Sequence, residues 1–511
     1  MPDATMLDVR RDLYRQFAVA PVAFSADGRD VRWAGPLDVG VEVGGIAVIE
    51  PDDGSRTVVQ IREVHIVERQ GPELTVQTGD GALGSYASSV EVTPMLRAVA
   101  GSAVILGRLN GSVFSPSDGV LPFGERALRP ATDAELAAVV DGLDAGQSTI
   151  TIGAQRQAAA VPARLRAKGF GRHTFMCGQS GSGKTYTTGV LFERLLASTG
   201  LPLIVIDPNS DHVHLGSLAN PDNRSPEGTR YRELAGSVQV AGARGSGADL
   251  TLCADFSDLD LDVQAALLQL HPVRDLDDYA LLRSLTENLI RPYSIAELAA
   301  IAASRPESGR LALRIENLGL PAWGLWRRDG EQSLVGDRQA ALPRCLVMDV
   351  GSLSRPAERT AVSLVLLGNR WARRRERQPM LLAVDEAHNV FPAVTDDPLL
   401  QQTAALGGLI AGEGRKFGLH LFVATQRPSK VHPNVVSQCD NLILMRMNGA
   451  GDVADLEELF SQVPPGLLRL STGFGLGQAL FAGPIAPVPL LAQVGARLTM
   501  EGGGDVAATW A

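Results

Sequence analysis

The most telling stretch of this chain, residues 178–185, reads Gly-Gln-Ser-Gly-Ser-Gly-Lys-Thr, with the spacing G-x-x-x-x-G-K-T. The apolar run Thr174–Cys177 before it has strand character, and Val190, Leu191, Leu195 and Leu196 after it have helical spacing. Glycines let backbone N–H groups curl around a phosphate, and the following helix points its positive end at the same anion. The stretch therefore predicts a phosphate cradle between a strand and a helix.

Each side chain of this cradle has an expected role. Lys184 would reach the β- and γ-phosphates of a nucleotide, and the Thr185 hydroxyl would bind Mg²⁺. The chain has four lysines and otherwise uses arginine, so a lysine here favours phosphate binding by a compact charge. The residues expected to contact ATP are Gly178, Ser180, Gly181, Ser182, Gly183, Lys184 and Thr185.

A second motif lies about two hundred residues downstream. The apolar run Met380–Val384 is followed by Asp385 and Glu386. A buried strand would leave these acids at its carboxyl end, near the phosphates. Asp385 is expected to hold Mg²⁺ through water, and Glu386 to orient and deprotonate the attacking water. Asp385–His388 also spells a helicase box, but the other motifs of those helicases are not evident.

Two further candidates flank the predicted strand Leu419–Ala424. Gln426 follows it and could sense the γ-phosphate or align the water; the alternative is a helix cap. Arg415 and Lys416 precede it, and a cation there could reach a phosphate of a neighbouring subunit as an arginine finger. The alternative for this pair is a solvated helix end.

Composition limits the class of protein. The chain has 511 residues, a formal net charge of -10 and 45% hydrophobic residues, which suits a globular protein. It has no run long and apolar enough for a membrane span and no apolar signal core at its start, so we expect a cytoplasmic protein without membrane contact. The acidic charge means that any DNA contact must be local.

The chain divides into four predicted parts. Short strands with glycine turns predict a small N-terminal β-barrel domain over residues 1–140, ending in a short helix, Ala131–Val140, capped by Thr132. Residues 141–165 are predicted to be a linker and 484–511 a Pro- and Gly-rich tail. Between them, residues 166–483 alternate strands and helices, with a helical insertion at about 259–340.

The core pattern predicts an α/β fold, a RecA-like P-loop NTPase core with a mainly parallel sheet. Continuous apolar runs suit strands buried on both faces of such a sheet. Besides the strand before the glycine loop, strands are predicted at Leu203–Asp207, Cys345–Val350, Met380–Val384, Leu419–Ala424 and Asn441–Met445.

A basic run precedes the acid-bearing strand. It contains Arg370, Arg373, Arg374, Arg375 and Arg377. The run could contact DNA, but a solvated helix face is the more common explanation of such a pattern.

Taken together, these motifs resemble the HerA branch of the HerA/FtsK superfamily. The matching segments are Arg172-His173-Thr174 leading to Gly178–Thr185, Ile206-Asp207-Pro208, Val384–His388, Gly414–Leu419 and Ala424–Ser429. The resemblance covers roughly 165–483, and the β-rich start is similar to the small barrel of HerA proteins. One segment departs from the family: after Asp-Pro, a His-Gly-Glu-Tyr-like continuation is common, whereas this chain has Asn209–His212.

The resemblance implies an ATP- and Mg²⁺-dependent homo-hexameric ring that threads double-stranded DNA. Its partner would be a NurA-like nuclease or a sirtuin-like NADase, in DNA end processing or anti-phage defence. It also implies that Arg172 belongs to the nucleotide site, that Asp207 lies beside it, and that Arg415 acts in trans. The alternative is a ring scaffold whose ATP binding assembles and regulates an effector with little translocation.

Overall fold

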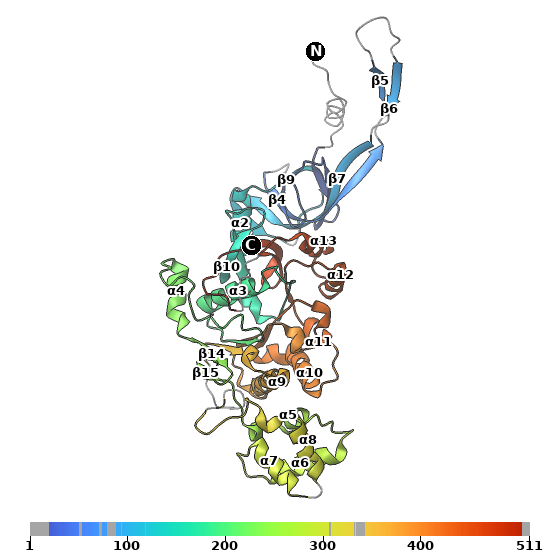
Figure 1. Ribbon diagram of the computed structural model, residues 1–511. Coiled ribbons are helices and arrows are strands. Elements are labelled where there is room, and N and C mark those ends of the chain that lie inside the picture. Colours follow the sequence, from blue (N-terminus) through green and yellow to red (C-terminus); the bar gives the residue numbers. More distant parts are fainter. Residues whose placement is uncertain are drawn as a thin grey trace, which may run out of the picture. The chain divides into compact units, whose positions relative to one another are not determined.

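The computed structural model describes residues 20–50, 54–70, 74–78, 88–92, 95–117, 119–305, 308–331, 333 and 343–502 (Figure 1). The chain divides into two compact units. One contains the described residues up to Gln147, with Gln157–Val161 and Pro464–Leu467. The other contains Ser148–Arg156, Pro162–Val463 and the described residues from Leu468 onward.

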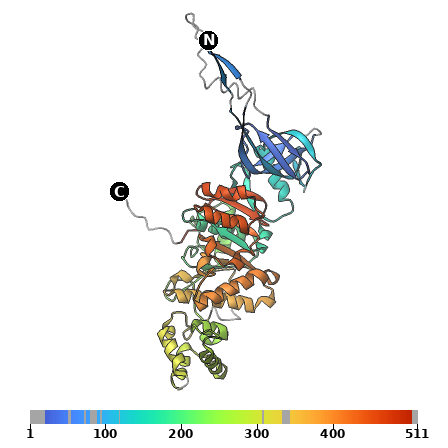
Figure 2. The same cartoon turned by 90° about the vertical axis from the view of Figure 1, so that its right-hand side faces the viewer.

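The first unit is built on a seven-stranded antiparallel sheet that closes on itself. The strand order is β2-β1-β9-β3-β4-β7-β8, and β2 also pairs with β7, which closes the strands from β2 to β7 into a ring, with β8 added beside β7 (Figure 2). The strands are β1 (Val22–Ser25), β2 (Asp30–Gly35), β3 (Ile46–Ile49), β4 (Arg56–Gln70), β7 (Met95–Asn110), β8 (Val113–Pro116) and β9 (Phe123–Pro130). Alternate residues of β7 point inward, and Val31, Trp33 and Ile61 fill the interior. The region expected to be a small barrel therefore contains a closed antiparallel sheet.

Two elements accompany this barrel. Strands β5 (Leu74–Thr78) and β6 (Ser88–Val92) form a separate antiparallel pair. Helix α2 (Asp133–Leu143) begins with a capping box in which Thr132 and Glu135 satisfy each other's backbone N–H groups. The predicted helix and its threonine cap are confirmed.

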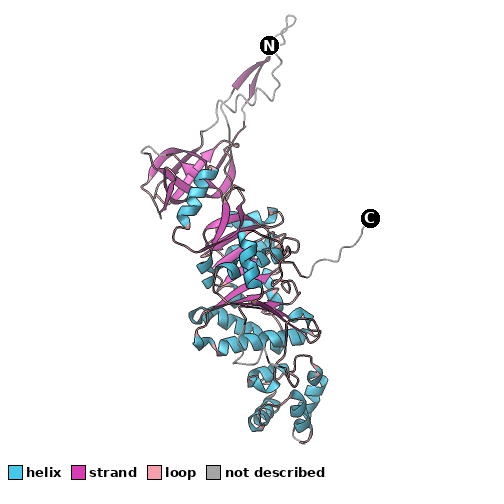
Figure 3. Cartoon of the chain, turned by 90° about the vertical axis from the view of Figure 1, so that its left-hand side faces the viewer, coloured by secondary structure: helices cyan, strands magenta, loops and turns pink. Residues whose placement is uncertain are grey.

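The second unit is built on a twelve-stranded sheet with order β11-β10-β21-β20-β19-β12-β18-β17-β13-β16-β14-β15 (Figure 3). Its strands from β19 to β15 in this order are parallel. They are β12 (Thr174–Cys177), β13 (Leu203–Asp207), β14 (Val238–Gly242), β15 (Leu250–Thr251), β16 (Cys345–Asp349), β17 (Met380–Val384), β18 (Leu419–Thr425) and β19 (Asn441–Leu444). The predicted core strands are confirmed, and so is the α/β class.

The antiparallel end of this sheet corrects two predictions. Residues expected to be linker form β10 (Thr149–Gln155) and β11 (Pro162–Arg166), and residues expected to be tail form β21 (Ala486–Val494), which pairs with β20 (Gln478–Gly483). Ile150 and Ile152 alternate with polar residues and are buried in the core. The prolines of β21 are tolerated because β10 pairs only with its last three residues, Ala492–Val494.

Helices surround the parallel strands. α3 (Lys184–Ser198) packs its apolar side against the core through Val190, Leu191, Phe192, Leu195 and Leu196. The other helices of this unit include α4 (Pro226–Ala235), α9 (Pro356–Ala372), α10 (Pro398–Glu413), α11 (Pro433–Val436) and α12 (Ala450–Leu459). Helix α13 (Pro465–Arg469) begins in the first unit and ends in the second. Within the part of the chain that the structure describes, every helix is too short or too polar to cross a bilayer.

The predicted helical insertion lies between β15 and β16. It contains α5 (Leu261–Leu267), α6 (Leu276–Asn288), α7 (Ile295–Ala303) and α8 (Gly309–Asn317), with buried residues such as Leu282, Leu298 and Ile315. Residues 306, 307, 332 and 334–340 of the predicted insertion lie outside the described residues. The described part of the insertion is mainly helical, as expected.

Candidate functional site

The glycine loop joins the carboxyl end of β12 to the first residue of α3. Gly181 and Gly183 have φ angles of 71° and 91°, in the left-handed region that glycine adopts without strain. A Cβ on Gly178 would lie 2.7 Å from the Cβ of Met445, so only glycine fits there. The Ser182 hydroxyl is buried and has no hydrogen-bond partner among the described residues. These features form the amide-lined cradle that the sequence predicts.

Lys184 lies against the two acids that follow β17. Its Nζ is 2.5 Å from Asp385 Oδ1 and 3.2 Å from Glu386 Oε1, although the residues are about two hundred positions apart. All three side chains are buried. The parallel strands explain the meeting: β12 and β17 are separated by one strand, β18, and their carboxyl ends lie at the same edge.

The charges of this group stabilise one another. Burial opposes the charged form of Lys184, but Asp385 and Glu386 outweigh it and hold the pKa of the ammonium above its usual value. Burial alone would raise the pKa of Asp385, but Lys184 and His212 hold that pKa below its usual range. The site therefore presents an ionised carboxylate and an ammonium in a water-poor setting.

Gln426 fixes the orientation of Glu386. The Gln426 amide donates from Nε2 to Glu386 Oε1 over 2.7 Å, and His388 Nδ1 lies 3.3 Å from the other oxygen, Oε2. Glu386 itself has a φ of 42°, a strained conformation for a residue with a Cβ. His388 Nδ1 is also 3.1 Å from Thr425 Oγ1. Gln426 thus holds one oxygen of the carboxylate, whereas Oε2 makes no hydrogen bond among the described residues.

The loop after β13 supplies residues that the sequence analysis did not assign to the site. Asp211 Oδ2 accepts from Thr185 Oγ1 at 3.4 Å, and His212 Nε2 lies 3.7 Å from Asp385 Oδ2. Burial, together with Asp207 and Asp385, raises the pKa of Asp211 to about 6. The sequence contains one signal that could have identified these residues: Asp211 and His212 follow the end of the predicted core strand Leu203–Asp207 by four and five residues.

Asp207 supports this loop. Its carboxylate accepts backbone N–H groups of Asn209, Asp211 and His212 at 3.2, 3.1 and 2.7 Å, and the side chain is fully buried. The family resemblance implies a place for Asp207 beside the nucleotide site, which stays a prediction. Its carboxylate fixes the loop that carries Asp211 and His212 to the site.

The structure does not bring Arg172 and Arg415 to the glycine loop of their own chain. Arg172 precedes β12 and Arg415 precedes β18, so both lie at the amino edge of the parallel sheet. Arg172 Nη1 and Arg415 Nη1 lie 3.1 and 3.4 Å from Asp440 Oδ2. Because a strand rises about 3.3 Å per residue, Arg172 and Gly178 are separated by about 15–20 Å. Arg172 therefore does not lie at the glycine loop of its own chain, and its place in a nucleotide site stays a prediction.

The basic run before β17 is used partly within the fold. Arg374 lies over the ring of Trp371 at 4.2 Å from its centroid, and Arg373 is paired with Glu376 at 3.0 Å. Arg370 is 4% exposed. The run thus includes guanidinium groups that pack within the fold, which differs from the solvated helix face that is the common explanation of such a pattern.

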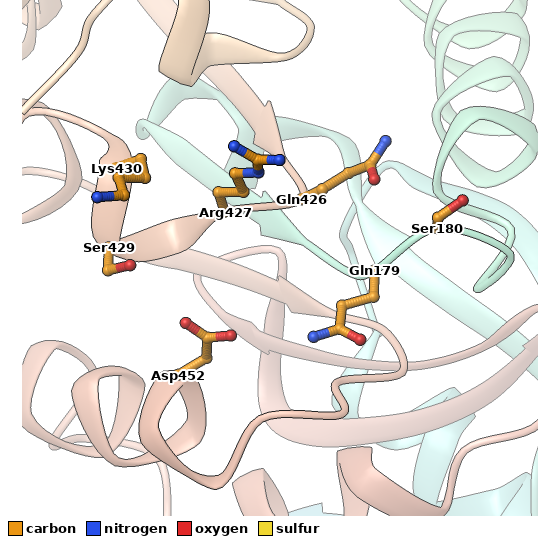
Figure 4. A pocket seen from close by; sticks show the side chains of 7 residues that line it. All are labelled: Gln179, Ser180, Gln426, Arg427, Ser429, Lys430 and Asp452. Carbon is orange, nitrogen blue, oxygen red and sulfur yellow. The ribbon is translucent and has the colours of Figure 1, made fainter.

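A pocket of about 460 Å³ opens beside Gln426 (Figure 4). It lies between the start of the glycine loop, the segment after β18 and helix α12. Its lining residues are Gln179, Ser180, Gln426, Arg427, Ser429, Lys430 and Asp452. Two cations and the hydrogen-bonding glutamine thus adjoin the cradle.

The donor set fits ATP with Mg²⁺. The cradle and Lys184 suit phosphate oxygens, and the hydroxyl of Thr185 and carboxylate of Asp385 are oxygen ligands of the kind that Mg²⁺ prefers. In the described part of the chain, no three His, Cys, Asp or Glu side chains gather as a complete metal cage. The ion would therefore take its other ligands from phosphate and water.

A strand, glycine loop and helix that meet a buried acid pair define the nucleotide-binding core of a P-loop ATPase. Comparison with known proteins narrows this class. Residues 150–300 match the family model described as Helicase HerA, central domain. The resemblance to HerA-type ATPases is confirmed over this part of the chain.

Among curated proteins, the chain is similar to a probable DNA double-strand break repair helicase HerA of Methanocaldococcus jannaschii, with 32% identity over 130 residues, 25% of each protein. It is also similar to the DNA double-strand break repair helicase HerA of Pyrococcus furiosus, with 32% identity over 116 residues, 23% of this chain and 20% of the relative. The matched stretch thus spans a quarter or less of these relatives' length.

Among solved structures, VirB4 of Thermoanaerobacter pseudethanolicus is similar with a TM-score of 0.49 and 17% identity, over 68% of this chain and 96% of that chain. The bacterial conjugative coupling protein TrwB is similar with a TM-score of 0.44 and 14% identity, over 70% and 88%.

Proposed function

We propose that this protein is an ATP-hydrolysing motor that translocates double-stranded DNA. The observation that carries the proposal is the buried group of Lys184, Asp385 and Glu386, which joins a phosphate cradle to two acids. At the terminal phosphate of a nucleotide, the ammonium would bind the phosphate oxygens and the acids would serve the metal ion and the attacking water. The similarity of residues 150–300 to the HerA central domain supports DNA as the substrate of the motor.

The side chains have distinct roles in the proposed reaction. The cradle amides and Lys184 bind the phosphates, and Lys184 exchanges its contact with the acids for one with the phosphate oxygens. Thr185 and Asp385 would hold Mg²⁺, which supplies charge neutralisation at the phosphates when bound. Glu386 orients the attacking water and accepts its proton, while Gln426 keeps that carboxylate in place.

The amino-edge position of Arg415 supports a role in trans. Its side chain is 49% exposed and held only by Asp440 among the ion pairs of the described residues. A guanidinium that faces away from its own cradle can stabilise the transition state in a neighbouring subunit. We therefore retain the homo-hexameric ring as the proposed assembly, with DNA in its pore.

The partner and pathway follow from the same proposal. A motor of this kind would work with a NurA-like nuclease in DNA end processing, or with a sirtuin-like NADase effector in anti-phage defence, in the cytoplasm. The barrel, which carries none of the nucleotide-site residues named above, is the proposed surface for the effector.

A second candidate is an ATP-binding hexameric scaffold that assembles and regulates its effector. The net charge of -10 favours it, because the chain lacks the excess of basic residues common in DNA-coating proteins. DNA-stimulated ATPase activity of the isolated protein separates the two. Strong stimulation by duplex DNA alone supports the motor, and stimulation that requires the effector supports the scaffold.

A further inference from the structure

We propose that the loop from Gly473 to Gln478, with Leu476 at its exposed tip, is the platform for the nucleoside part of the bound nucleotide. This inference rests on the proposed function, because it assumes that phosphates occupy the cradle. The loop would contact the nucleoside, whereas the cradle contacts the phosphates.

The loop lies directly against the cradle. Gly477 donates its backbone N–H to the carbonyl oxygen of Ser182 over 3.1 Å. A Cβ on Gly183 would lie 3.4 Å from Gly477 N and 3.5 Å from Leu476 Cδ1. Gly183 is the N-cap residue directly before α3, so Leu476 stands beside the end of the cradle from which the nucleoside of a triphosphate must extend.

Hydrogen bonds hold the backbone of this loop, and the side chain of Leu476 is exposed. The Gln493 amide donates from Nε2 to the Leu476 carbonyl oxygen over 3.1 Å, and Val494 N–H donates to the Gly477 carbonyl oxygen over 2.9 Å. On either side, Phe474 and Ala479 are buried, whereas Leu476 is 70% exposed. Single exposed leucines are common on protein surfaces. At Leu476, however, the backbone is held beside the cradle by the hydrogen bonds just given, which suits a preformed contact.

The chemistry of the contact sets its specificity. A leucine side chain can pack on the face of a purine ring and exclude water there. Because it has no hydrogen-bonding group, it cannot distinguish the polar edges of adenine and guanine. We therefore expect the platform to favour nucleoside triphosphates over inorganic triphosphate, and to distinguish ATP from GTP only weakly.

The test compares Leu476→Ala with the unchanged protein in the full chain. Titration calorimetry with ATP should give about fivefold weaker binding, the effect of uncovering roughly 40 Å² of apolar surface, while inorganic tripolyphosphate should bind as before. Leu313→Ala on α8 is the matched control, because Leu313 is 59% exposed and belongs to the insertion. Unchanged ATP binding in Leu476→Ala, or an equal loss for tripolyphosphate, would overturn the inference.

A second measurement does not depend on a mutation. Photolabelling with 8-azido-ATP should modify the peptide that contains Leu476, and excess ATP should prevent it. Labelling confined to other peptides would count against the platform. If neither ATP nor tripolyphosphate binds the unchanged protein, the proposed function itself fails and the platform falls with it.

Discussion

The Gln426 amide donates a 2.7 Å hydrogen bond to Glu386, across two adjacent parallel strands and from residues forty positions apart. Glu386 is 4% exposed and adopts a φ of 42°. A side chain in a strained backbone conformation that is also held by an amide is preorganised for one task. In the proposed mechanism this task is acceptance of the attacking water's proton.

Glu386→Gln should retain ATP and stall hydrolysis, because an amide cannot accept the water's proton. We expect turnover to fall by about 10²–10⁴-fold, the usual contribution of a general base, with ATP affinity within a few-fold of normal. Single-turnover hydrolysis and equilibrium binding measure the two effects. A variant that hydrolyses ATP at the normal rate would remove Glu386 from the mechanism.

Gln426→Leu should lower turnover through Glu386. Because the two side chains act together, the double variant with Glu386→Gln should be scarcely slower than Glu386→Gln alone. Additive losses in this cycle would mean that Gln426 acts independently, for example by direct contact with the γ-phosphate.

Lys184→Ala should abolish ATP binding and also destabilise the fold. It leaves Asp385 and Glu386 buried without the ammonium, and removing one partner of a buried pair costs about 3–5 kcal/mol. Because the bare acids can take up a proton, the loss in melting temperature should be smaller at pH 5 than at pH 7. Lys168→Ala, at an exposed lysine of the same unit, is the control and should change neither quantity.

Asp211→Asn should alter how stability depends on pH. In the fold the pKa of Asp211 is raised to about 6, mainly by burial, whereas in the unfolded chain it is near 3.9. The folded state therefore binds the extra proton between these values, so stability from this group is full below about pH 4 and is lost as pH rises through about 6. Relative to Asp211→Asn, the unchanged protein should lose melting temperature from pH 4.5 to pH 7. Equal slopes for both proteins would contradict this, and Asp329→Asn, at an exposed site, serves as the matched control.

Arg415→Ala should lose ATPase activity without losing ATP binding, because the residue lies at the edge of the sheet opposite its own cradle. Mixing it with Glu386→Gln subunits should restore part of the turnover, since some interfaces then combine an intact Glu386 with an intact Arg415. Native mass spectrometry would verify mixed rings, and verified mixed rings without recovery would argue against action in trans.

Local patterns predicted those parts of the molecule whose structure depends on nearby residues. The glycine loop, the apolar strands and the Thr132 cap were recognisable because spacing, burial on both faces and capping are short-range properties. The strands β10, β11 and β21 were missed because the hairpin of β10 and β11 joins the large sheet through β21, which lies far along the chain. Asp211 and His212 reach the site because of which strand ends share an edge, and no local pattern contains that order.

The sequence by itself determined that this chain builds a phosphate cradle and an acid pair, since glycine spacing and buried strands follow from short-range sterics and hydrophobicity. Only the tertiary structure decided that Lys184 touches both acids, that Asp207 supports a loop, and that Arg172 and Arg415 lie at the far edge. The physical reason is the order of the parallel strands, which sets the neighbours of every strand end and is fixed by packing across the whole sheet.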